Sequence, residues 1–367
     1  MKTAVDPELR EIMEVPHYRP ALSIILPVDT DVSLKTEAAH TLKTTADKAE
    51  QALKEFYPEE YCDLIMQKLH SLIDELDIPA NSRGIALFVS PLFKKVCYLD
   101  FPVTEKIIVD DSFEIRDLLY NARQNINFIV VMLSGRGSKV FTGDRISIQP
   151  LHTNIPATVD SFIADTPERV TNFTDMTEHK QNVLNKFLLH VDEALDDLLQ
   201  QYRLPVLLIG TKKTLGQFKK ISKGSYKTIG YVEGNYEKLT TTALTKLIQP
   251  FINSWQENNQ QEILKRLDEA AGQHRLTTGI LQVWQAVQNG HGKLLVVEKN
   301  FRFAAQHGPQ PDIIEPAIEP YNHFTFIRDA VDDVIEKILM SGGEVEFIEN
   351  GRMIQYDHIA LINYYPQ

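Results

Sequence analysis

The stretch Asn127-Phe128-Ile129-Val130-Val131-Met132-Leu133 is the most strand-like run in the chain and decides the fold. A glycine turn at 134–138 and a return strand at 139–142 follow it, which predicts a β-hairpin. A long amphipathic helix and a second buried strand, Pro205 to Gly210, come further along the chain. Strands that alternate with helices predict an α/β domain with a mixed sheet.

The first third of the chain reads strand, helix, helix, strand, strand, helix. Leu22 to Pro27 is a short apolar run stopped by proline, as expected of a buried strand. Apolar residues at three- and four-residue spacing predict a helix at 35–56 and a second one soon after it. The runs 84–90 and 95–101 predict a hairpin, and 113–122 predicts another helix.

The last third also alternates between helices and strands. Helices are expected at 240–253, 256–272, 277–287 and 330–340, and strands at 293–297, 344–348 and 359–362. Trp255 separates the first two helices, and 306–322, with four prolines, predicts an extended loop. The predicted fold class is therefore α/β in three domains with mixed sheets, at 1–124, 125–237 and 238–367.

Composition limits the class of protein. With 367 residues, 43% hydrophobic and 24% charged, the chain resembles a folded protein of two or three domains. No apolar run approaches the roughly 18 residues that span a bilayer. Because the N-terminus also lacks a signal-peptide core, we expect a cytoplasmic protein. Cys62 and Cys97 belong to no CxxC or Cys/His cluster and predict two buried thiols, so no metal site and no cofactor is expected.

Charge is distributed unevenly along the chain. The formal net charge is −12, which argues against a protein that coats nucleic acid. The three predicted domains carry net charges of −8, +1 and −5 in chain order. Contact with an RNA backbone is therefore expected in the middle domain.

Six lysines form a dense positive run in this acidic chain. They lie within 211–227, a stretch without an acid: Lys212, Lys213, Lys219, Lys220, Lys223 and Lys227. A solvated helix face is the usual role of such lysines, and contact with RNA backbone is the functional alternative. Only Phe218 and Tyr226 accompany them, so the sequence does not suggest stacking on bases.

Two glycine turns invite comparison with phosphate-binding loops. Gly135-Arg136-Gly137-Ser138-Lys139 lacks both the spacing of a P-loop and a following helix, so a tight hairpin turn is the better interpretation. Gly210-Thr211-Lys212-Lys213-Thr214 follows a strand and opens a helix, a geometry that can bind phosphate through backbone N–H groups. The same pattern is also how an ordinary strand-to-helix turn is made.

The polar stretch 150–177 predicts a long loop, and loops of this length are usually functional or disordered. His179 and Gln181 follow it, at the start of the long helix. A histidine there can act as a general base near neutral pH. No carboxylate is placed by spacing to orient His179, so a structural or surface role is the alternative.

Two pairs of adjacent aspartates, Asp110-Asp111 and Asp332-Asp333, have the composition of an acid/base or Mg²⁺ pair. Adjacent side chains on a helix or a turn point in different directions. We therefore expect solvated charges at both pairs.

Three stretches, in this order, resemble the archaeal and eukaryotic class 1 peptide release factor and its relative Pelota. The strand 23–27 and the hairpin 81–101 look like the N-terminal domain of that family. The long loop, the helix and Leu207-Leu208-Ile209-Gly210 resemble its RNase H-like central domain. Residues 285–363 are similar to the C-terminal domain shared with kink-turn-binding ribosomal proteins. The whole pattern most resembles the bacterial families of archaeo-eukaryotic release factor-like proteins.

The resemblance implies a protein that binds the ribosome or tRNA, in peptide release or in the rescue of stalled ribosomes. The middle domain would meet RNA, the C-terminal domain would bind a protein partner such as a translational GTPase, and no membrane is implied. The Gly-Gly-Gln motif with which the family hydrolyses peptidyl-tRNA is absent, and Gln181 is the only glutamine near the matching place. The stop-codon motif Asn-Ile-Lys-Ser is also absent, and Thr41-Leu42-Lys43-Thr44-Thr45 stands in the corresponding stretch.

These departures leave two other functions open. One is an esterase in which loop residues such as His179 and Gln181 replace Gly-Gly-Gln. The other is a non-catalytic protein- or RNA-binding module that reuses the fold and holds a partner through residues 251–367.

Overall fold

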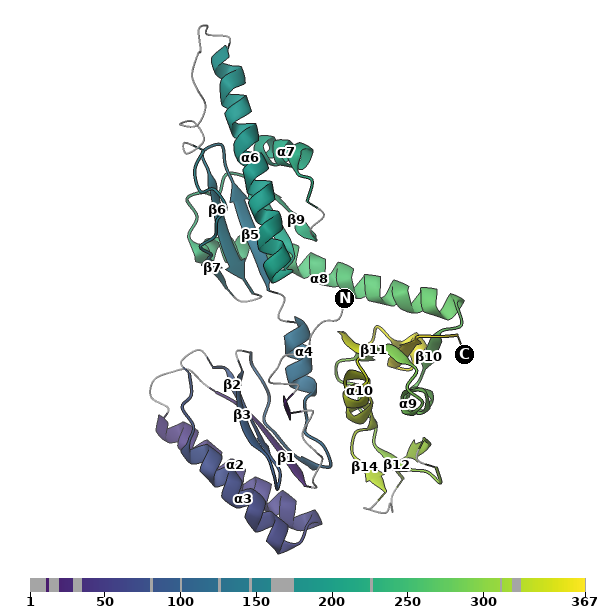
Figure 1. Ribbon diagram of the computed structural model, residues 1–367. Helices are drawn as coiled ribbons and strands as arrows, with labels where there is room; N and C mark the ends of the chain where they lie inside the picture. Colours follow the sequence, from purple (N-terminus) through teal and green to yellow (C-terminus); the bar gives the residue numbers. More distant parts are fainter. Residues whose placement is uncertain are drawn as a thin grey trace. The chain divides into compact units, whose positions relative to one another are not determined.

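The computed structural model places the chain in two units (Figure 1). It describes residues 11–12, 20–28, 35–79, 82–99, 101–124, 127–144, 147–159, 175–224, 227–310, 312–318 and 325–366. Unit 1 combines Met1–Gln124 with Lys265–Gln367, and unit 2 is Asn125–Leu264. The first predicted domain boundary, after residue 124, coincides with a boundary between the units. The division into three domains stays a prediction.

Unit 1 contains an antiparallel sheet in the order β3-β2-β1-β4. Its elements are β1 (Ala21–Pro27), α2 (Lys35–Phe56), α3 (Glu59–Asp74), β2 (Gly84–Val89), β3 (Lys94–Leu99), β4 (Lys106–Asp110) and α4 (Arg116–Gln124). Leu22, Ile24 and Leu26 of β1 pack in one core with α2 and α3. Ala21 and Ile25 belong to a second core. Because both faces of β1 are covered, an apolar residue is favourable at nearly every position.

A mixed sheet in the order β10-β16-β11-β15 also lies in unit 1. Its elements are β10 (Leu276–Thr278), α9 (Ile280–Gln288), β11 (Gly292–Glu298), α10 (Ala330–Met340), β15 (Glu344–Ile348), the 3₁₀ turn η1 (Ile354–Tyr356) and β16 (Ile359–Asn363). β11 pairs in parallel with β15 and antiparallel with β16. A Cβ at Gly292 would lie 2.1 Å from Ile338 Cδ1, so this glycine permits the close approach of α10.

A small antiparallel sheet completes unit 1. It has the order β13-β12-β14, with β12 (Ala305–His307), β13 (Ile314–Pro316) and β14 (Phe326–Ile327). The prediction of an extended loop at 306–322 is therefore wrong for 306–307 and 314–316, which are strand residues. Ala305 pairs with both Pro316 and Ile327. These partners are distant in sequence, which local patterning does not reveal.

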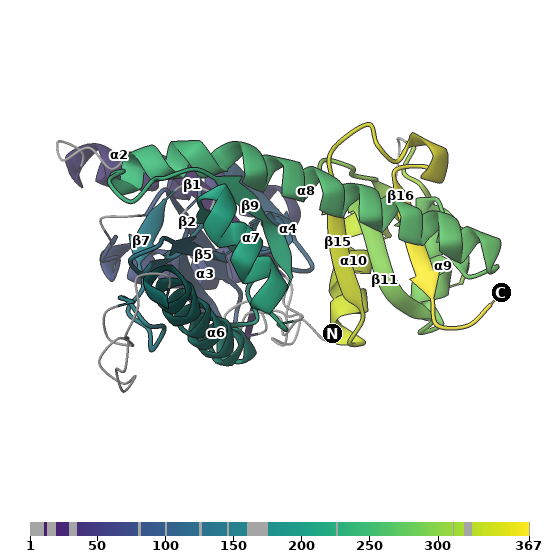
Figure 2. The ribbon, with the colours of Figure 1, turned by 90° about the horizontal axis from the view of Figure 1, so that it is seen from above.

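Unit 2 is built on a five-stranded mixed sheet in the order β7-β6-β5-β8-β9. Its elements are β5 (Phe128–Leu133), β6 (Ser138–Gly143), β7 (Ile148–Pro150), α6 (Asp175–Tyr202), β8 (Val206–Gly210), α7 (Lys212–Ile221) and β9 (Thr228–Glu233). β5, β6 and β7 are antiparallel neighbours, whereas β8 and β9 run parallel to β5. Helices α6 and α7 cover one face (Figure 2), through a core that contains Phe187, Leu195 and Phe218.

Six edge strands are absent from the sequence prediction. β4, β7, β9, β10, β13 and β14 each lie at the end of a strand order. They are short or only half-buried, so their apolar pattern is weak. Pairing with an already formed neighbour strand decides their structure.

Helix α8 (Thr241–Gly272) is continuous, so the predicted break at Trp255 is wrong. Its first turns bury Leu244, Ile248 and Ile252 in a core of unit 2. Near its end, Leu267 and Ala270 are buried as well. Because both ends are anchored by burial, the polar centre stays helical, and Pro250 is accommodated inside the helix.

The predicted α/β fold class with mixed sheets is confirmed by these elements. Cys62 and Cys97 are free and buried, as predicted. Of the predicted loop 150–177, residues 160–174 lie outside the described part of the chain. In the described part, a β-bridge joins Gly137 to Thr158. Among the described helices, none has the length and apolar character to cross a bilayer.

Candidate nucleic-acid interface

The start of α7 carries the first two lysines of the predicted run. The side chain of its N-cap residue, Thr211, accepts a hydrogen bond from the backbone N–H of Thr214 at 3.3 Å. Lys212 and Lys213 form the first turn, which contains no acid. Their ammonium groups add to the positive end of the helix dipole, so this end of α7 favours an anion.

The other lysines continue the same surface. Lys219 and Lys220 lie seven residues after Lys212 and Lys213, which is close to two helical turns, so each pair shares a stripe of α7. The exposed side chains of Lys212, Lys213, Lys219, Lys220, Lys223 and Lys227 together form what we call the lysine surface. The structure therefore brings these residues together on one helix and the connection after it.

Asp192 anchors that connection to α6. Its buried carboxylate accepts a hydrogen bond from Ser222 Oγ at 2.6 Å and another from the backbone N–H of Lys223 at 2.9 Å. Two hydrogen bonds to one carboxylate hold the backbone at the end of α7. The lysine surface is thus supported from beneath by a buried acid of the neighbouring helix.

Two aromatic rings join the lysine surface from other elements. The Lys219 ammonium lies 3.5 Å from the ring centroid of Tyr231 on β9. The Lys227 ammonium lies 5.0 Å from the ring of Trp255 on α8. Both rings are half-buried, and both contacts have cation–π geometry. Sequence reasoning missed them because tertiary structure alone brings β9 and α8 to α7.

Of the two aromatic residues noted in the lysine run itself, the structure describes Phe218. Phe218 is 1% exposed and belongs to the core beneath α7. Tyr226 lies outside the described residues.

The predicted catalytic pair lies near the start of α6. His179 is part of this helix, but its side chain lies outside the described part of the structure. Gln181 is half-buried on the same helix. A catalytic role for either residue remains a prediction.

The carboxyl ends of β5 and β8 define a second place for a ligand. These neighbouring strands are parallel, and the chain leaves β5 toward β6 but leaves β8 toward β9. Ligands of open α/β sheets bind at such a switch point. A pocket of about 270 Å³ lies at the carboxyl end of β5, lined in part by Ser134, Arg136, Lys139 and Lys238.

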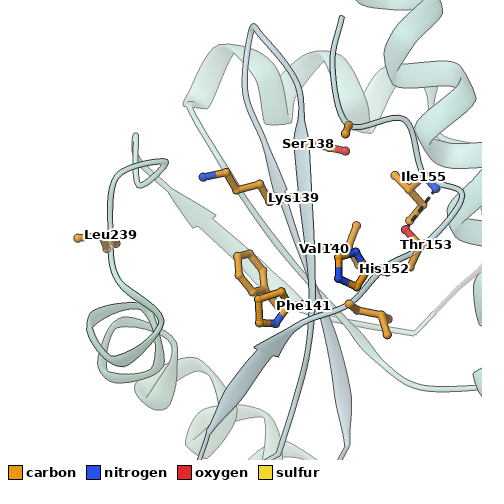
Figure 3. A pocket seen from close by; sticks show the side chains of 11 residues that line it. Ser138, Lys139, Val140, Phe141, His152, Thr153, Ile155 and Leu239 are labelled. Carbon is orange, nitrogen blue, oxygen red and sulfur yellow. Dashed lines mark hydrogen bonds between the residues drawn. The ribbon is translucent and has the colours of Figure 1, made fainter. Parts of the chain in front are cut away.

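A neighbouring pocket of about 410 Å³ lies along β6 (Figure 3). It shares Ser138 and Lys139 with the first pocket, and it adds His152 and Leu239. The lining combines cationic, hydroxyl and apolar side chains. Such a mixture is typical of small-molecule sites, whose volumes run from about 300 to 1,000 Å³.

The hairpin turn beside these pockets is not a P-loop. Ser134 Oγ accepts hydrogen bonds from the backbone N–H groups of Arg136 and Gly137, at 3.1 and 3.0 Å. The N–H of Ser138 bonds Ala157 O at 3.0 Å. Because these N–H groups are occupied, a phosphate here would depend on side chains, which agrees with the hairpin interpretation.

Unit 1 contains a buried ionic cluster around Arg116. This side chain is 3% exposed. Its Nε donates to Asp332 Oδ1 at 2.6 Å, its Nη2 to Asp329 Oδ2 at 2.9 Å and its Nη1 to Phe301 O at 2.5 Å. The prediction that Asp332 is a solvated charge is therefore wrong, because its partner lies 216 residues away in sequence.

Burial raises the pKa of several carboxyl groups in this cluster. The pKa of Glu114 is raised to about 8 by burial and by the nearby charge of Asp332. Burial and the charge of Asp110 raise the pKa of Asp333 to about 8. The pKa of Asp329 is raised to about 6, again by burial, although Arg116 opposes the shift. Among the described residues, no cluster of His, Cys, Asp or Glu could hold a metal ion.

These shifts predict how the stability of unit 1 depends on pH. A carboxyl group whose folded pKa is raised binds more protons in the folded state, so its contribution to the unfolding free energy falls as pH rises. For Glu114 the fall spans pH 4.5 to about 8. Glu114→Gln should therefore gain in Tm relative to wild type as pH rises across that range, measured by calorimetry. A constant difference in Tm would contradict the shifted pKa.

Comparison with known families finds a match in the middle part of the chain. Residues 127–291 match the family model described as bacterial archaeo-eukaryotic release factor family 3. The resemblance predicted from the sequence is thereby confirmed. The matched segment contains the lysine surface and both pockets. No curated protein matches the chain.

Solved structures of translation factors resemble the chain over most of its length. The archaeal termination factor aRF1 is 13% identical, with 98% of this chain and 96% of that chain covered and a TM-score of 0.25. Ribosome-bound archaeal Pelota with ABCE1 is 12% identical, with 98% of this chain and 94% of that chain covered and a TM-score of 0.44. S. cerevisiae Dom34, described as interacting with Hbs1, is 13% identical, with 81% of this chain and 78% of that chain covered and a TM-score of 0.42. At these TM-scores the likenesses carry no argument about activity.

Proposed function

We propose that this protein is a release factor-like factor of the cytoplasm that binds the ribosome or tRNA, in peptide release or in the rescue of stalled ribosomes. The observation that carries the proposal is the coincidence of two features in one segment. Residues 127–291 match the release factor family, and the exposed lysine surface lies within them. Clustered lysines in an otherwise acidic chain are suited to an RNA backbone.

Each of the three proposed domains would have its own binding partner. We assign the N-terminal domain, 1–124, to the decoding region and the RNase H-like central domain, 125–237, to RNA. The sheet of unit 2 supports the RNase H-like assignment, because three antiparallel strands, β5 to β7, are followed by two strands that run parallel to β5. The C-terminal domain, 238–367, would bind a protein partner of the translational GTPase kind, in line with the described interaction of Dom34 with Hbs1.

Co-sedimentation with bacterial ribosomes over a salt series tests this function. We expect wild type to bind, with an affinity that falls steeply as salt rises. A variant with Lys212, Lys213, Lys219 and Lys220 changed to Glu should lose binding. Its matched control changes the exposed residues Lys186, Lys246, Lys265 and Lys293 to Glu, with the same change in net charge.

The control variant should remain bound to the ribosome at low salt. Equal loss of binding in both variants would mean that net charge, not the lysine surface, governs association. Absence of wild-type binding at low salt, with or without peptidyl-tRNA, would refute the proposed function. It would favour the non-catalytic module, which the absence of Gly-Gly-Gln also supports.

If the protein releases peptide, we propose that His179 and Gln181 contribute, since they follow the loop that occupies the place of Gly-Gly-Gln. Peptidyl-tRNA cleavage should then fall in His179→Ala and in Gln181→Ala while ribosome binding persists. Unchanged cleavage in both variants would remove these residues from the mechanism.

A further inference from the structure

A groove runs along β6 in unit 2. It consists of the two pockets described above, which share Ser138, Lys139 and Ala157. In the strand order β7-β6-β5-β8-β9, β6 lies on one side of β5, whereas α7 connects β8 to β9 on the other. No residue of the lysine surface lines either pocket, so the groove is a separate feature.

The groove exists because the chain after β7 leaves β6 and then returns to it. The backbone N–H of Leu151 bonds Val140 O at 2.9 Å, and the N–H of Ser138 bonds Ala157 O at 3.0 Å. Between these two bonds, His152, Thr153 and Ile155 line the outer wall (Figure 3). Ser138 Oγ also donates to Pro156 O at 2.6 Å. The wall is thus held by hydrogen bonds at both ends.

A glycine sets how closely this wall approaches the hairpin. A Cβ on Gly137 would lie 2.1 Å from Ala157 O, which is closer than a real side chain allows. The backbone of the hairpin and that of the wall therefore meet without side chains between them. Because of this close approach, the end of the wall is hydrogen-bonded to the start of β6 as part of the sheet.

One end of the groove is cationic. Arg136, Lys139 and Lys238 line the smaller pocket, where Glu237 is the one acid among the lining residues. The Lys139 ammonium donates to the backbone carbonyl oxygen of Glu237 at 3.0 Å. This bond holds the ammonium where both pockets meet and leaves two of its N–H bonds for a ligand. Three cations against one acid favour an anionic group such as phosphate.

The other end is largely apolar. Phe141, Leu151, Ile155 and Leu239 line the larger pocket, with His152 and Thr153 as polar neighbours. The pocket volume of about 410 Å³ lies in the range of small-molecule sites. Flat, apolar faces with a few hydrogen-bonding groups at the rim suit a heterocyclic base.

We propose that this groove binds a nucleotide, either free or as an unpaired residue of an RNA strand. The phosphate lies against Arg136, Lys139 and Lys238, and the base lies on the apolar lining near Leu239. No bond is made or broken in this step. The free-nucleotide form is independent of the proposed function, whereas the RNA form rests on it.

Calorimetric titration of the full chain with adenosine 5′-monophosphate, uridine 5′-monophosphate, adenosine and a pentaribonucleotide tests the proposal. We expect the monophosphates or the pentanucleotide to bind, and adenosine to bind more weakly by about tenfold or more, because it lacks the anion. Arg136→Ala with Lys139→Ala should raise the Kd by about tenfold or more. Lys246→Ala, an exposed lysine of the same unit, is the matched control and should leave the Kd unchanged.

A second variant keeps the proposal testable if the first variant does not fold. Leu239 is 42% exposed, so Leu239→Asp should fold, place a negative charge at the apolar end and weaken binding. Binding of a monophosphate that these variants abolish would identify a free nucleotide as a ligand. Binding of the pentanucleotide alone, with the same sensitivity, would identify an RNA residue. No binding of any probe, or binding that neither variant weakens, would overturn the proposal.

The outcome is distinguishable from failure of the proposed function. Changing Lys212, Lys213, Lys219 and Lys220 to Glu should abolish ribosome binding but leave monophosphate binding in the groove intact. If Arg136→Ala with Lys139→Ala keeps full affinity for every probe while ribosome binding depends on the lysine surface, the groove proposal falls and the function stands.

Discussion

Replacing Arg116 by alanine should lower the unfolding free energy of unit 1 by about 3 to 5 kcal/mol, the range for breaking a buried ion pair by removing one partner. The guanidinium donates to Asp329, Asp332 and the carbonyl oxygen of Phe301. Without the guanidinium, the carboxylates of Asp332 in α10 and of Asp329 at its N-cap lose their positively charged partner. In calorimetry, the transition of unit 1 should move to lower temperature.

An exposed ion pair of the same unit is the control for Arg116→Ala. Lys48 lies 2.7 Å from Glu105, and both side chains are largely exposed. Pairs of this kind contribute about 0 to 1 kcal/mol, so Lys48→Ala should change the transition little. Equal losses for the two variants would show that burial of the Arg116 cluster does not set its contribution.

The second large effect is expected in unit 2. Phe187 of α6 is 0% exposed and lies in the core between this helix and the sheet. Truncation of a buried phenylalanine removes its apolar contacts and leaves a cavity, so Phe187→Ala should cost about 3 to 5 kcal/mol. Circular dichroism and calorimetry should show a lower transition temperature for unit 2.

Leu189 provides the matched control on the same helix, because it is only half-buried. Leu189→Ala should cost clearly less than Phe187→Ala. Together, the Arg116 and Phe187 variants test the division into two units, since each should shift one transition and spare the other. A single transition shifted equally by both variants would show that the units unfold together.

Most central strands of the sheets were predictable, whereas most edge strands were not. Phe128–Leu133 and Val206–Gly210 are buried on both faces, so their apolar character is visible in the sequence. β7 has three residues, of which one is buried. An edge strand of this kind is stabilised by backbone pairing with a neighbour, which leaves little trace in its side chains.

The candidate sites also differ in how far the sequence predicts them. The lysine surface was predictable because its members lie within 17 residues of sequence, from 211 to 227. Tyr231 and Trp255, the Arg116 cluster and the groove on β6 were not predictable. Each depends on side chains from elements that are separated in the chain and meet only on folding.

Local information in the sequence was sufficient for the α/β class, for most helix and strand positions and for the resemblance to release factors, because periodicity and burial act over a few residues. Tertiary structure alone decided the continuity of α8, whose polar centre has no helical stripe of its own but lies between two anchored ends. It also decided that Asp332 is paired and not solvated. In both cases the decisive energy comes from contacts with distant residues, which local sequence patterns do not record.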